Sequence, residues 1–171
     1  PLKWKKPRRV FVCSMGDIFH EQVPDEYIAK VWEVMSNASQ HTFLVLTKRP
    51  QRMKDFLARL GWYTHDREVN PAEAVLDEGG KYTLKNVWLG VTAENQQRAD
   101  ERIPILLQIP AALRFVSIEP MLGPVVIPEE WPDWVICGGK TGPGARPIHP
   151  DWVRSLRDQC QAAGTPFFFK S

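Results

Sequence analysis

The fold class predicted for this chain rests first on Phe43-Leu44-Val45-Leu46-Thr47-Lys48-Arg49-Pro50. Its four consecutive apolar residues indicate a strand buried on both faces, as the strands of parallel sheets are. Polar residues end the strand, and Pro50 is favoured in the first turn of a helix. The spacing of Met53, Phe56, Leu57 and Leu60 places them on one apolar face of that helix. Gly61 is expected to end the helix. The stretch therefore predicts a strand, a polar loop and a helix.

The same unit recurs in both directions along the sequence. Further apolar runs predict strands at residues 10–13, 87–91, 115–118, 134–137 and 167–169. Helical periodicity predicts one helix after Pro24, one near residues 95–107 that is broken or restarted at Pro104, and one around Trp152 that ends before Gly164. The segment after the fourth run is expected to be irregular, because it contains Pro124 and Pro128.

Six strands that alternate with helices indicate parallel βα units with right-handed crossovers. A doubly wound sheet and a (β/α) barrel both satisfy this pattern. We favour the barrel, because no G-x-G-x-x-G loop follows the first strand and polar residues follow nearly every strand. The predicted fold is therefore α/β, with residues 1–171 forming a single partial (β/α)-barrel domain of six parallel βα units, part of a TIM-like barrel. Residues 61–85 interrupt the pattern and are expected to be a surface insertion that is mobile or acts as a lid.

Composition places the chain among ordinary globular domains, since 43% of its 171 residues are hydrophobic and 25% are charged. The three cysteines lie far apart, which excludes a zinc knuckle or disulfide framework and predicts a reducing, cytoplasmic location. A net charge of +2 is too mild to indicate nucleic-acid binding, and the basic residues 3–9 are interpreted as a solvated connector. The apolar runs are too short to span a membrane. Because the sequence starts at Pro1 without Met and stops just after an apolar run, we expect it to be part of a longer protein.

Polar residues that follow the predicted strands are the candidate site, because barrels place their working residues at the carboxyl ends of strands. Carboxylates and cations that meet there can bind a charged cofactor and hold a general acid or base. The catalytic candidates are Asp17, Lys48 and Glu119, and the cofactor-binding candidates are Ser14, Glu94, Gly138 and Gly139. Glycine amides can approach a phosphate, carboxylate or adenine closely. Helix capping, loop salt bridges and an ordinary flexible loop remain the alternative explanations. No metal site is expected from the scattered histidines and cysteines.

Several of these strand ends carry ordered motifs that together resemble one known family. The motifs are Cys13-Ser14-Met15-Gly16-Asp17-Ile18-Phe19-His20-Glu21, residues 41–50, Asn86-Val87-Trp88-Leu89-Gly90-Val91, Arg114-Phe115-Val116-Ser117-Ile118-Glu119-Pro120 and Gly142-Pro143-Gly144-Ala145-Arg146-Pro147. They resemble the phage-derived family of unknown function named after phage gene products thirty-seven and sixty-eight, also discussed as a three-Cys-motif family. The resemblance covers nearly the whole chain apart from residues 61–85.

Members of that family look similar to radical S-adenosylmethionine enzymes, in which a segment with three closely spaced cysteines holds a [4Fe–4S] cluster and the cluster cleaves S-adenosylmethionine. The resemblance implies that Asp17 and Glu119 orient ligand hydroxyl or amino groups, and that Lys48 balances a carboxylate or phosphate. This chain lacks the cysteine segment, so no cofactor is expected within it, and by itself it should be inactive. It also departs from the family pattern at Lys140, where Glu is common, and at Cys13, where Asn is frequent.

Two functions from different classes follow from these observations. The first is part of a radical S-adenosylmethionine-like barrel enzyme whose substrate is left open. The second is a non-redox, phage-encoded barrel that acts as a binding or partner-scaffold module, by self-association or through a partner at its open sheet edges. A metal-independent hydrolase or isomerase is a third possibility, but the sequence offers no nucleophile–base pair for it.

Overall fold

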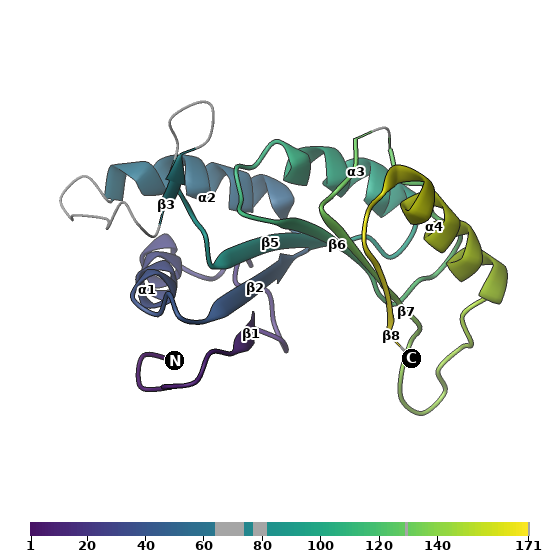
Figure 1. Cartoon of the computed structure of the whole chain (residues 1–171), viewed down its shortest axis with the longest axis horizontal. Coiled ribbons are helices and arrows are strands. Elements are labelled where there is room, and N and C mark those ends of the chain that lie inside the picture. The colour runs from purple at the N-terminus through teal and green to yellow at the C-terminus, as the bar shows by residue number, and fades with distance from the viewer. Residues whose placement is uncertain (64–73, 77–81, 129, 171) are drawn as a thin grey trace.

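The computed structural model of the chain describes residues 1–63, 74–76, 82–128 and 130–170. Six strands form one sheet in the order β1 (Arg9–Val12), β2 (Thr42–Thr47), β5 (Val87–Thr92), β6 (Arg114–Ile118), β7 (Trp134–Gly138) and β8 (Phe167–Lys170). Every neighbouring pair in this sheet is parallel. The sheet curls into a half-barrel, so the predicted α/β class and the six parallel strands are confirmed (Figure 1).

In the described part of the chain, four helices lie outside the curled sheet: α1 (Asp25–Ser36), α2 (Pro50–Tyr63), α3 (Gln96–Leu107) and α4 (Pro150–Ala163) (Figure 1). Local chemistry fixes their ends. Pro50 and Pro150 open α2 and α4, the side chain of Asn95 accepts a hydrogen bond from the Arg98 amide at the start of α3, and Gly164 ends α4 in the left-handed conformation. The segment that follows β6 has no helix in residues 119–128 and 130–133, as predicted.

Alternate residues of each central strand face two separate apolar layers. Toward the helices, Val45, Val91 and Val116 are buried in the main core with residues such as Ile28, Met53, Ile103 and Leu156. On the concave face a smaller cluster contains Leu44, Phe115 and Ile136, with Trp88 and Trp134 packed against it. The apolar runs of the sequence are continuous because both faces of the central strands are buried.

Gly90 and Phe115 show how tightly the concave face is packed. A Cβ atom at Gly90 would lie 2.5 Å from the Phe115 ring, so the ring rests directly on the backbone of β5. At the two sheet edges the concave face is less covered, since Phe11 of β1 is 44% exposed and Phe168 of β8 is 51% exposed.

Two predicted helix interruptions are wrong. α3 continues through Pro104, because Pro104 lies on its exposed side while Ile103 and Leu106 are fully buried and hold the helix in place. Burial of that apolar face offsets the one backbone hydrogen bond that proline cannot make. α2 likewise does not end at Gly61 and runs on to Tyr63.

Part of the predicted insertion at residues 61–85 has defined structure. β3 (Ala74–Leu76) and β4 (Tyr82–Leu84) form a separate antiparallel pair, with Ala74 opposite Leu84. Leu84 packs against the main core, which anchors this pair next to the start of β5. The rest of the insertion, with the expected mobility or lid role, lies outside the described residues. Among the helices of the described residues, none is long and apolar enough to cross a membrane.

Candidate functional site at the carboxyl edge

Because all six strands are parallel, their carboxyl ends meet at one edge of the half-barrel. Charged side chains from several strand ends are paired there. We call this set the carboxyl edge, and it comprises Asp17, Lys48, Arg49, Glu94, Arg102, Glu119 and Lys170.

Asp17 lies in the loop after β1 and accepts four hydrogen bonds. Its Oδ1 accepts from the Phe19 amide at 2.9 Å and from the Thr47 hydroxyl at 2.8 Å. Its Oδ2 accepts from the Lys48 amide at 3.0 Å and from Arg49 Nη1 at 3.1 Å. These bonds hold the loop after β1 against the end of β2, so the carboxylate fixes the position of Lys48.

Glu94 follows β5 and sits between two cations. Its Oε1 is 3.3 Å from Lys48 Nζ, and its Oε2 is 2.9 Å from Nη1 of Arg102, which also donates to the Thr92 carbonyl at 2.7 Å. Burial raises the pKa of Glu94, but a hydrogen bond from its own backbone amide and the charges of Arg102 and Lys48 outweigh that effect and lower the pKa overall. Glu94 is therefore held as an anion beside a Lys48 side chain that is 54% exposed.

Glu119 follows β6 and reaches across β7 to β8. Its Oε1 is 2.8 Å from Lys170 Nζ, and Lys170 is 57% exposed. A Cβ atom at Gly138, between them on β7, would lie 3.3 Å from both Cγ and Cδ of Glu119 and 3.2 Å from the Lys170 carbonyl oxygen. Because Gly138 has no side chain, the Glu119 side chain can cross over β7 at this position and reach Lys170.

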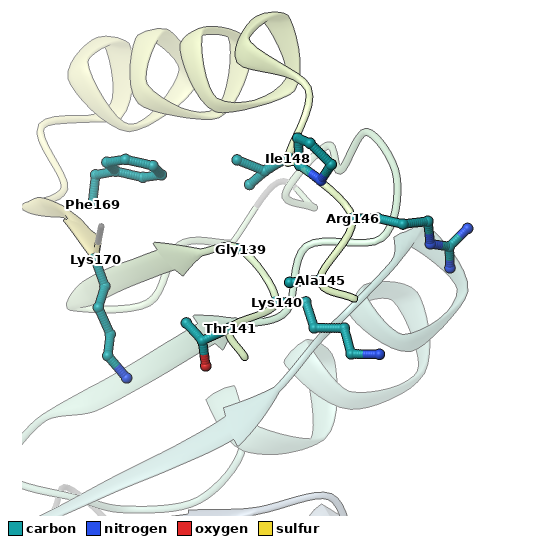
Figure 2. A pocket seen from close by; sticks show the side chains of 9 residues that line it. Gly139, Lys140, Thr141, Ala145, Arg146, Ile148, Phe169 and Lys170 are labelled. Atoms are coloured by element: carbon teal, nitrogen blue, oxygen red, sulfur yellow. The ribbon is translucent and has the colours of Figure 1, made fainter. Parts of the chain in front are cut away.

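Ser14 and Gly139 lie apart from these ion pairs. Ser14 is exposed in the turn that follows β1, where Cys13 has a φ of 54° and its carbonyl accepts from the Gly16 amide. Gly139 lines an open pocket of about 220 Å³ beside β7 and β8 (Figure 2). The other lining residues are Lys140, Thr141, Ala145, Arg146, Pro147, Ile148, Phe169 and Lys170.

Sequence reasoning missed Arg102 and the pocket wall. Arg102 lies on the side of α3 that buries Ala99, Ile103 and Leu106. A cation at a position of the apolar helix face could have indicated a buried ion pair in the sequence. No comparable signal marked Ile148 or Phe169, because both read as ordinary apolar residues in the sequence.

The cysteines do not gather at the carboxyl edge. Cys137 and Cys160 are fully buried, and burial raises the pKa of Cys137 to about 12 and that of Cys160 to about 11. Both belong to the main core between the sheet and the helices. In the part of the chain that the structure describes, no group of three or more His, Cys, Asp or Glu side chains could hold a metal ion.

Comparisons with known proteins place the chain in a family without giving it an activity. Searches of the curated proteins and of the solved structures found no match. One family model, however, matches residues 1–171, and its description is "Protein of unknown function (DUF5131)". The expected membership of a family of unknown function is thereby confirmed. With its fold and its paired carboxyl edge, the chain belongs to this family of proteins of unknown function, DUF5131.

Proposed function

We propose that the carboxyl edge binds S-adenosylmethionine, as the ligand-binding side of a TIM-like (β/α)-barrel enzyme of the radical S-adenosylmethionine type. The observation that carries the proposal is the Glu119–Lys170 pair, which joins the ends of β6 and β8 next to the Glu94–Lys48 pair in the same edge. An edge that offers both carboxylates and exposed ammonium groups suits a ligand whose amino-acid end is itself zwitterionic.

The exposure of the two lysines supports exchange of partners with a ligand. Lys48 and Lys170 are 54% and 57% exposed, whereas Glu94 and Glu119 are only 16% and 25% exposed, so each lysine can turn from its carboxylate to a ligand carboxylate without leaving water. Glu119 and Glu94 would then accept from the ligand ammonium group. Asp17 would act as a positioning residue, since its two oxygens already accept four hydrogen bonds.

The residues of this chain do not fit an iron–sulfur cluster. Cys13 is exposed in the turn after β1, whereas Cys137 and Cys160 are buried among the apolar residues that pack beneath the helices. The proposal therefore assigns cluster ligation to cysteines outside this sequence, and two further βα units would close the six strands into an eight-stranded barrel. S-adenosylmethionine bound beside a reduced cluster supplies radical chemistry to an enzyme. The family resemblance further supports a phage-related protein, and the scattered cysteines support a protein that acts in the reducing cytoplasm.

Anaerobic calorimetry on the gene product that carries this chain tests the binding step. We expect S-adenosylmethionine to bind, and Glu119→Gln to weaken it by about tenfold or more, because a charge-assisted hydrogen bond is lost. 5′-Methylthioadenosine lacks the amino-acid end, so its affinity should be unchanged by the same substitution. Glu21→Gln, in an exposed loop, is the matched control. Equal weakening of both ligands, or no binding of S-adenosylmethionine, would contradict the proposal.

A second candidate function rests on the open sheet edges. Phe11 on β1 and Phe168 on β8 are large apolar side chains that stay about half exposed at the two ends of the concave face. Such edges favour association with another chain, which suits a binding or scaffold module. Size-exclusion chromatography with light scattering separates the two functions, because a monomer at all concentrations argues against edge-driven self-association.

A further inference from the structure

The pocket at Gly139 has apolar walls. Ala145, Pro147 and Ile148 line it from the returning loop, and Phe169 lines it from β8 (Figure 2). Its volume of about 220 Å³ is below the roughly 300 to 1,000 Å³ of sites for drug-sized ligands. The pocket therefore has room for one ring-sized group and leaves the remainder of a ligand at its mouth.

Two cations at this pocket have no partner among the residues that the structure describes. Lys140 and Arg146 make no ion pair or side-chain hydrogen bond with any residue that the structure describes. Figure 2 shows both side chains extending from the loop toward the same side, whereas Lys170 extends from β8 on the other side. Lys170 is already paired with Glu119. Like charges without a counterion repel each other, so a bound anion would stabilise this arrangement.

The backbone of the loop is specialised to carry these cations. Gly142 and Gly144 have φ values of 95° and 71°, which side-chain-bearing residues rarely adopt, and the Ala145 amide donates to the Gly142 carbonyl at 3.1 Å. A Cβ atom at either glycine would meet no neighbour, so glycine is needed for the turn itself and not for packing. After this turn the chain returns to the pocket, so that Arg146 and Lys140 both line it, and Ile148 packs near Gly139.

We infer that this pocket binds a ring-bearing phosphate, of the class of nucleoside monophosphates. The ring would lie against Ile148 and Phe169, and the phosphate would lie at the mouth between Lys140 and Arg146. A phosphate fits better than a single carboxylate, because two free cations match an anion of nearly two charges. The inference does not depend on S-adenosylmethionine binding, because the two sites share only Lys170.

Titration with AMP, adenosine and inorganic phosphate, followed by calorimetry and by NMR of the amides of residues 139–148, tests this inference. AMP should bind saturably and shift those amides, while adenosine and inorganic phosphate should each bind at least about tenfold more weakly, since each lacks one half of the recognised chemistry. Affinity for AMP should also fall as salt is added.

Charge reversal locates the phosphate. Lys140→Glu should lower the affinity for AMP by about tenfold or more. Lys30→Glu, the same change at an exposed position of α1, should leave that affinity unchanged. Lys140→Glu should leave S-adenosylmethionine affinity unchanged, because Lys140 is not one of the carboxyl-edge residues assigned to that ligand, so failure here is distinguishable from failure of the proposed function. Absence of saturable AMP binding, adenosine binding as tight as AMP, or an unaltered AMP affinity in a folded Lys140→Glu protein would each overturn the inference.

Discussion

Glu119 Oε1 lies 2.8 Å from Lys170 Nζ, and this pair joins the ends of two strands that are not neighbours in the sheet. β7 runs between them, and its last residue is Gly138. The pair exists in this form because nothing larger than hydrogen stands at that position. The strand end thus combines a charged pair with the space that the pair needs.

Gly138→Ala is expected to destabilise the protein by about 1 to 3 kcal/mol, because the new methyl group would press on Glu119 and on the backbone of β8. Urea unfolding measures the change. Gly16→Ala is the matched control, since a Cβ atom there meets nothing within 4 Å. Equal stability of the two variants would show that Glu119 moves aside at no cost.

Asp17→Asn is expected to cost about 2 to 4 kcal/mol of stability, because an amide group would face backbone and Arg49 donors that now bond to a carboxylate oxygen. Thermal or urea unfolding measures this loss. Asp158→Asn removes a carboxylate from an exposed pair with Arg157 and should change stability by no more than about 0.5 kcal/mol. A full-stability Asp17→Asn protein would contradict the positioning role.

Acid stability should depend on Glu94. Its pKa is lowered in the folded protein, so the ionised carboxylate contributes stability that is present above its ordinary pKa of 4.5 and is lost as the pH falls through the lower, folded pKa. Unfolding free energy measured from pH 7 down to pH 3 should therefore fall less steeply in Glu94→Gln than in the parent protein. Glu21→Gln, at an exposed loop position, provides the comparison. The prediction would be wrong if the unfolding free energy of the parent protein and of Glu94→Gln fell equally between pH 7 and pH 3.

Only one of the three thiols should react readily in the folded protein. Cys13 is exposed, whereas burial raises the pKa of Cys137 to about 12 and of Cys160 to about 11. Since the thiolate is the reactive form, an aromatic disulfide reagent at pH 8 should react quickly with one thiol of the folded protein and with three thiols in denaturant. Cys13→Ser should abolish the fast reaction. Rapid reaction in that variant would mean that Cys137 or Cys160 is accessible.

The order of the six sheet strands and of the helices was predictable, because each buried strand is a continuous apolar run and each helix has its own periodicity. The antiparallel pair of β3 and β4 was not predicted within the insertion at residues 61–85. The error at Pro104 arose because tertiary burial of the apolar face of α3 overrides the local preference of one residue, whereas for α2 the structure shows only that the helix runs past Gly61 to Tyr63. Asp17, Lys48, Glu94 and Glu119 were predicted from their places after strands, and all four lie in ion pairs or hydrogen bonds at the carboxyl edge. Their pairings and the route of Glu119 over Gly138 depend on contacts between distant strands, which the sequence does not contain.

We propose that the carboxyl edge serves radical S-adenosylmethionine chemistry. The most direct measurement is anaerobic reconstitution of the gene product with iron and sulfide, followed by reduction and quantification of 5′-deoxyadenosine by mass spectrometry. We predict a visible cluster absorption and formation of 5′-deoxyadenosine, strongly reduced in Glu119→Gln but not in Glu21→Gln. Absence of both the cluster spectrum and 5′-deoxyadenosine would rule out the proposed radical S-adenosylmethionine function.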